Sequence, residues 1–142
     1  MKKLILGVSL VVAATTATAR DDIGRYSVDE LLKTSKAQQT LDPEIKLFFG
    51  KQDAGKVLST YGEVQTNKKT NAVNKSDKEA CQWVMLSALK AMQQRARKEG
   101  MNAVVNISSF YKKREFVSDT EFECGAGFLM AGVTLKGDLV KL

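Results

Sequence analysis

Apolar residues between Ser76 and Gly100 form the clearest pattern in the chain. They recur at steps of three and four, which is the spacing of one face of an α-helix. Ser76 and Glu79 make the S-x-x-E pattern of a capping box, and Gly100 suits the residue that follows a helix end. This pattern predicts one long helix with Gln93 on its solvent side. Its predicted buried stripe consists of Cys81, Val84, Met85, Ala88, Met92 and Ala96.

Strand patterns follow this helix. Residues 103–111, 120–124, 128–135 and 139–142 each have the alternation or the apolar run of a strand, and the charged residues 112–115 predict a hairpin turn between the first two. The order of elements predicts an α+β fold. In it, one long helix packs on a mostly antiparallel sheet of about four to five strands.

The chain before the helix predicts one further strand. Residues 55–66 have its pattern, with Val57, Tyr61 and Val64 as expected core contacts. Residues 67–75 are polar and lack a packing pattern, so we expect an exposed loop there.

The first 19 residues have the three parts of a cleavable export signal. Lys2 and Lys3 precede the apolar residues 4–14, and the small residues Ala17 and Ala19 stand three places and one place before the predicted cut. The apolar stretch is too short to span a bilayer, which takes roughly 20 residues. We therefore expect cleavage after Ala19, a periplasmic location and no transmembrane anchor.

The rest of the chain divides into two parts. Residues 20–54 carry only short patterns, a capped helix near 28–33 and a strand near 44–49, and are expected to form a loosely packed lead segment. Residues 55–142 are expected to form the α+β domain. One domain of this size can bury a modest core.

The chain has two cysteines, Cys81 and Cys124. Export to an oxidising compartment favours a disulfide between them. Cys81 lies on the buried stripe of the predicted helix, and Cys124 shares a strand face with Phe122 if Glu121 and Glu123 face water. We therefore expect a bridge from the helix start to the strand. Use of the thiols for a metal or a redox step stays open but is disfavoured, because the two are not a C-x-x-C pair.

Composition excludes several kinds of chemistry. The chain has no histidine, which removes histidine acid–base catalysis, catalytic triads and most zinc and copper sites. The carboxylates show no pairing of the kind that a two-carboxylate enzyme needs. We expect no enzymatic activity and no cofactor. Loss of Lys2 and Lys3 with the signal would lower the net charge from +6 to +4, which is mildly basic.

Residues 50–56 fit most of a phosphate-binding loop, G-x-x-x-x-G-K. The next residue, Val57, stands where a serine or threonine would bind magnesium, and a strand rather than a helix is predicted to follow. We expect a turn here and no binding of ATP.

A basic cluster is the remaining candidate for a contact site. Lys112, Lys113 and Arg114 follow two aromatic residues, and Lys68 and Lys69 are expected to add to them in space. Such a cluster suits an anion, a partner or single-stranded nucleic acid. An ordinary charged hairpin tip is the favoured interpretation, and export argues further against nucleic acid.

From Gly55 onward the chain resembles a bacterial family. The resemblance lies in the helix end and following strand, residues 98–105 (KEGMNAVV), and in the closing residues 130–142 (MAGVTLKGDLVKL). It is similar to small exported proteins labelled "excinuclease ATPase subunit", to domains labelled heavy-metal-binding, and to the core of the lipoprotein that senses envelope stress in the Rcs phosphorelay. The resemblance implies an α+β fold, and self-association through the sheet, as in some members.

These observations favour a non-enzymatic periplasmic domain that acts through contacts with an envelope protein or with a second copy of itself. The alternative is a small-ligand or metal-binding module. A third hypothesis, nucleic-acid binding, depends on the basic cluster alone.

Overall fold

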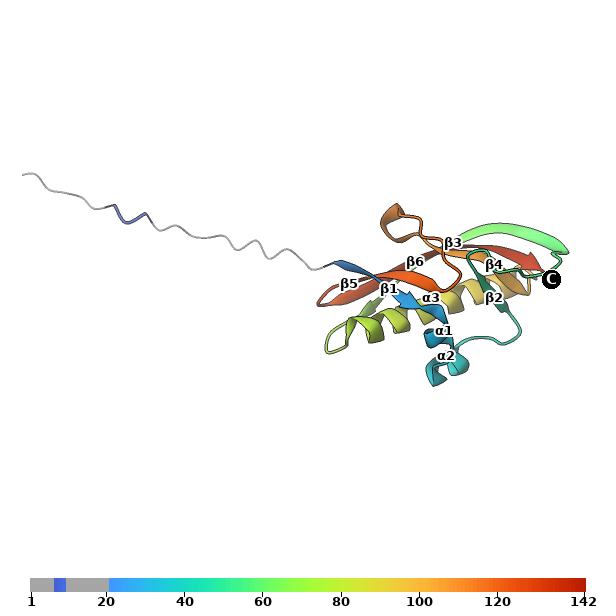
Figure 1. Ribbon diagram of the computed structural model, residues 1–142, viewed down its shortest axis with the longest axis horizontal. Coiled ribbons are helices and arrows are strands. Elements are labelled where there is room, and N and C mark those ends of the chain that lie inside the picture. Colours follow the sequence, from blue (N-terminus) through green and yellow to red (C-terminus); the bar gives the residue numbers. More distant parts are fainter. Residues whose placement is uncertain (1–6, 10–20) are drawn as a thin grey trace, which may run out of the picture.

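The computed structural model describes residues 7–9 and 21–142 (Figure 1). The predicted export signal and its cleavage point therefore lie almost wholly outside the described residues. The elements in chain order are β1 (Asp22–Ser27), α1 (Val28–Leu32), α2 (Ser35–Thr40), β2 (Lys46–Phe49), β3 (Ser59–Asn71), α3 (Asp77–Lys98), β4 (Ala103–Ser109), the short 3-10 helix η1 (Tyr111–Lys113), β5 (Glu121–Ala126) and β6 (Met130–Lys141).

In the described part of the chain, six strands form one sheet built around β6. On one edge, β3 pairs antiparallel with β6 along its whole length. On the other edge, β5 pairs with the start of β6 and β4 with the rest of it. β1 extends the sheet beside β5, antiparallel, and β2 extends it beside β4, parallel. The expected fold class, one long helix on a mostly antiparallel sheet, is confirmed.

The predicted hairpin between residues 103–111 and 120–124 is wrong. β4 and β5 both pair with β6 and lie end to end along its edge, so residues 110–120 leave the sheet between them. An isolated bridge from Ser109 to Phe116 begins this excursion. The predicted separation of a last strand at residues 139–142 is wrong too, because β6 continues through Gly137 and Asp138.

Helix α3 begins and ends where the sequence predicts. The Ser76 hydroxyl accepts a hydrogen bond from the Glu79 backbone N–H at 3.1 Å, and Gly100 has a φ of 74°, which glycine adopts without strain. The buried face is wider than the predicted stripe, since Leu86, Leu89 and Gln93 are buried as well. Among the helices of the described residues, none combines the length and the apolar character needed to cross a membrane.

Gln93 is buried because the lead segment packs on this part of α3. Its side-chain amide donates hydrogen bonds to the backbone carbonyls of Asp42 and Ile45, and its carbonyl accepts from the Asp42 N–H. Residues 20–54, expected to be loosely packed, thus contribute two strands and several core side chains. The buried apolar residues of this segment are Val28, Leu31, Ala37, Ile45 and Phe49.

Strand β3 departs from the sequence prediction in its polar half. Residues 67–71, expected in a loop, continue the strand, while Val57 and Tyr61, expected in the core, are exposed. Val64 packs against the core. Backbone pairing with β6 holds this strand, so a polar sequence suffices for it.

The two faces of the sheet carry unequal cores. The main core lies between the sheet and α3, and its largest members from the last two strands are Phe122, Val133, Leu135 and Leu139. The opposite face, here called the back face, has a smaller cluster at the C-terminal end of β6. That cluster consists of Ala103, Val105 and Val140, with Phe48, Ala54 and Leu142 against it.

A disulfide joins Cys81, near the start of α3, to Cys124 on β5. The Cα atoms are 5.9 Å apart, and neither residue is exposed to solvent. The bridge therefore fastens the start of the main helix to the sheet, as predicted, and both thiols are used for structure.

Removing the disulfide should lower stability substantially. The bridge spans 43 positions, for which the chain-entropy model gives a stabilisation of about 4 kcal/mol. In urea unfolding, reductant should lower the free energy of unfolding of the wild type by an amount of this order. The C81S/C124S variant should have a lower free energy of unfolding than the oxidised wild type, and reductant should not change it. Equal stability of the oxidised and reduced wild type would contradict this.

Candidate functional site

Three consecutive apolar side chains project from the turn between β5 and β6. Phe128 is 71% exposed, Leu129 is 68% exposed, and Met130 is also exposed. We call these three residues the apolar tip. Backbone hydrogen bonds hold the turn in place, from the Gly127 N–H to the Met130 carbonyl at 2.9 Å and from the Ala72 N–H to the Leu129 carbonyl at 2.8 Å. The tip is therefore a hydrogen-bonded turn fastened to the end of β3.

A hollow of about 360 Å³ lies beside the apolar tip. Its volume is within the range of small-ligand sites. We call it the tip hollow. Besides the tip, its lining includes Asp21, Lys69, Tyr111, Gly125 and Gly132.

The ring of Tyr111 rests on two glycines that are paired across β5 and β6. Gly125 and Gly132 are register partners, and a Cβ placed on Gly125 would come within 2.3 Å of the Tyr111 hydroxyl oxygen. A Cβ on Gly132 would lie 3.2 Å from the same ring. The two glycines therefore form the seat of the tyrosine. The strands predicted at residues 120–124 and 128–135 leave Gly125 between them, and no local pattern indicates this role.

Asp21 connects this tyrosine to the basic segment that follows it. The Tyr111 hydroxyl donates a hydrogen bond to Asp21 Oδ1 at 3.1 Å, and the Lys112 ammonium forms an ion pair with Asp21 Oδ2. The hydrogen bond from Lys112 lowers the pKa of the Asp21 carboxyl, and the positive charge of Lys69 acts in the same direction. Burial and the nearby Asp21 charge raise the pKa of Tyr111.

The structure brings together some of the predicted basic residues and separates others. Lys69 and Lys112 both lie near Asp21. Lys68 lies on the opposite face of the sheet, because its register partner Val133 belongs to the core under α3. Lys113 and Arg114 are exposed beyond Lys112 and form no ion pair with any residue that the structure describes.

The aromatic residues near the basic cluster make contacts within the protein. Tyr111 is seated on the glycines, and the Lys136 ammonium lies 3.5 Å from the centre of the Phe110 ring. Arg25 lies 4.2 Å above the Phe116 ring and pairs with Glu123, which is 3% exposed. The expectation that Glu123 faces water is therefore wrong. Glu123 lies on the back face of the sheet, where its backbone N–H donates a hydrogen bond to the Ser109 hydroxyl.

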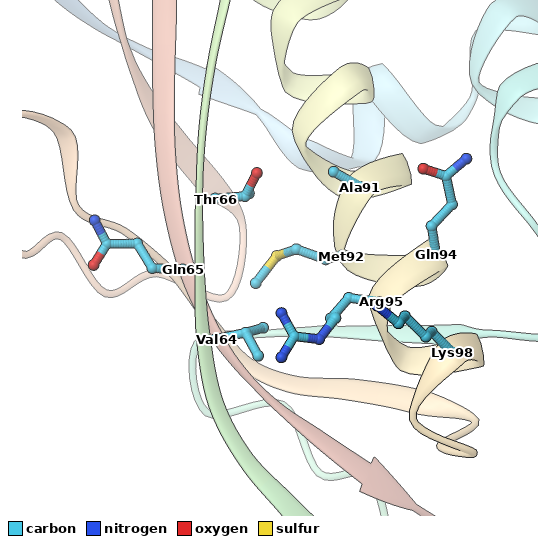
Figure 2. Close-up of a pocket in the computed structure, with 8 residues that line it drawn as sticks. All are labelled: Val64, Gln65, Thr66, Ala91, Met92, Gln94, Arg95 and Lys98. Carbon is cyan, nitrogen blue, oxygen red and sulfur yellow. The ribbon is translucent and has the colours of Figure 1, made fainter.

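A second hollow, of about 330 Å³, lies between β3 and α3 (Figure 2). We call it the β3–α3 groove. Val64, Ala91 and Met92 give it apolar walls, and Figure 2 shows the Arg95 guanidinium pointing from α3 toward Val64. This guanidinium donates hydrogen bonds to the Tyr61 hydroxyl at 2.8 Å and to Glu99 at 3.1 Å. Lys98 adds a second positive charge one turn along the helix.

The segment that fits part of a phosphate-binding loop, residues 50–56, forms a turn that leads toward β3 and opens no helix. Its backbone is bound to a carboxylate of the protein itself. The Lys51 N–H donates to Asp119 Oδ1 at 2.7 Å, and the Gln52 amide donates to the Asp119 carbonyl at 3.0 Å. A Cβ on Gly50, which has a φ of 60°, would also meet Asp119.

Neither a metal-binding group nor a match to a known protein identifies a functional site. Among residues 7–9 and 21–142, no three histidine, cysteine, aspartate or glutamate side chains are grouped to hold a metal ion. No family model and no curated protein matches this chain. The apolar tip, the tip hollow and the β3–α3 groove remain as candidate contact sites.

Replacing Lys112 with glutamine should raise the pKa of Asp21 toward the ordinary value of 3.8, because the donor that favours the ionised carboxyl is lost. The pKa of Asp21 is lower in the folded protein than in the unfolded chain, so the Asp21–Lys112 pair stabilises the fold at pH values above the unfolded-state pKa. This stabilisation is lost as the pH falls through the folded-state pKa. NMR titration of the Asp21 carboxyl carbon measures the shift. K113Q, one residue on and without a bond to Asp21, is the matched control. Equal shifts in both variants would contradict the assignment.

Proposed function

We propose that this protein is a non-enzymatic periplasmic domain that acts by contacting other components of the cell envelope through the apolar tip. The observation that carries the proposal is the exposure of Phe128, Leu129 and Met130 in a hydrogen-bonded turn. Exposed apolar groups that adjoin one another are typical of a contact surface.

The proposed compartment is supported by two features. The buried disulfide between Cys81 and Cys124 is consistent with folding in an oxidising environment. The pattern of residues 1–19 is that of an export signal. The resemblance of the second half of the chain to an envelope-stress sensor supports a role in the envelope.

The non-enzymatic part of the proposal follows from the side chains available. The chain has no histidine, and both cysteines are joined in the disulfide. At the tip hollow, the Asp21 carboxylate accepts a hydrogen bond from Tyr111 and forms an ion pair with Lys112. These bonds hold the segment that carries Tyr111 and Lys112 in place, and they leave the Asp21 carboxylate with partners within the protein.

The β3–α3 groove favours a second candidate, binding of a small anionic amphiphile. Its apolar walls include Val64 and Met92, and Arg95 reaches over them from α3 (Figure 2). A guanidinium beside apolar walls suits a carboxylate that carries a hydrocarbon chain.

The tip should contact an envelope component in living cells. A photo-crosslinking amino acid at Leu129 should give reproducible adducts in intact cells, because this side chain is 68% exposed at the proposed surface. Leu58 is the matched control: it is 64% exposed but lies at the other end of β3. Denaturing gels followed by mass spectrometry identify the products. Adducts that are absent at Leu129, or equal at both positions, would argue against the tip as the contact surface.

The groove should stabilise the fold when a suitable ligand is added. Decanoate is the probe, and we expect it to raise the melting temperature of the wild type in a saturable manner, because ligand that binds the native state alone stabilises it. R95M should abolish the rise, while K90M, which changes a charge on α3 outside the groove, should retain it. No rise in the wild type, or an equal rise in R95M, would remove this candidate.

A further inference from the structure

We propose that the apolar tip docks on the surface of a bilayer that contains anionic lipids. This inference rests on the proposed function and names the envelope component as lipid. The shape of the tip favours lipid over a protein partner. A stable protein–protein interface buries about 800 Å² on each partner and involves roughly 20–30 residues a side. The tip presents only three consecutive apolar side chains on a projecting turn, a shape that fits a fluid lipid interface better than a broad protein surface.

Positive charge lies beside the tip hollow. Lys69 lines the tip hollow together with the apolar tip, and Lys112 is paired with Asp21 on its rim. Lys113 and Arg114 follow in the chain and are exposed, with no ion pair to a residue in the described ranges. Cations around an inserting apolar group are attracted to anionic lipid headgroups.

The chain enters the domain beside the turn that carries the apolar tip. β1 begins at Asp22, whose register partner is Ala126, next to the turn that carries the tip. Figure 1 shows the start of β1 and the β5–β6 turn at the same end of the molecule, away from the C-terminus. Before cleavage, residues 15–20 alone separate the apolar stretch of the export signal from Asp21. In the precursor, the length of these six residues limits how far the predicted export signal can lie from Asp21.

The test uses the exported protein purified with its disulfide intact. Co-sedimentation is measured with vesicles of phosphatidylcholine alone and with vesicles of phosphatidylcholine and phosphatidylglycerol in equal amounts. We expect binding to the anionic vesicles that weakens as salt is added. F128S/L129S should lower the partition coefficient roughly tenfold by removing the inserted groups. L58S, the same kind of change at the other end of β3, should leave it unaltered, and K113Q/R114Q should lower it several-fold on anionic vesicles alone.

Each outcome decides the inference. Absence of binding, equal binding to both kinds of vesicle, or equal losses in F128S/L129S and L58S would overturn it. Circular dichroism and thermal unfolding of each variant separate lost binding from lost folding. If vesicles are not bound but the crosslinker at Leu129 captures a protein in cells, the bilayer assignment fails and the proposed envelope contact stands. If neither experiment gives a product, both fail.

Discussion

Strand β6 pairs on both edges, and the arrangement of the rest of the molecule depends on this pairing. β3 occupies one edge, while β5 and β4 divide the other between them. Because β4 and β5 lie end to end, the chain between them has to leave the sheet and return. That excursion brings Tyr111 onto the paired glycines Gly125 and Gly132, where it closes one side of the tip hollow. Topology thus positions the candidate site.

The disulfide extends this constraint to the apolar tip. Cys124 comes directly before Gly125, and its partner Cys81 lies near the start of α3. Fixing β5 to the helix at this point holds the strand that leads into the exposed turn. The turn's own hydrogen bonds, and the bond from Ala72, complete its support. A backbone held in this way would lose little conformational entropy if the turn bound a partner, so more of the contact free energy would be retained.

Local signals made part of this structure predictable. The Ser76 cap, the stripe of α3 and the face shared by Cys124 and Phe122 lie within short stretches of sequence, and they predicted the helix and the disulfide. The polar strand β3 and the buried Gln93 depend on partners distant in the chain, β6 and the lead segment, so no local pattern reveals them. Residues 128–130 read as a strand because an exposed apolar turn and a buried apolar strand have the same composition.

The exposure of the tip has no explanation in the folding of the chain. Turns commonly carry glycine, asparagine, aspartate or serine, and the hydrogen bonds of this turn are made by the backbone of Gly127, Leu129 and Met130. A serine at Leu129 would keep the same backbone bonds. The apolar side chains bury little surface within the domain, and they present a liability for aggregation that a positively charged chain only partly offsets. The proposed contact with the envelope would bury these side chains and so give them a favourable environment.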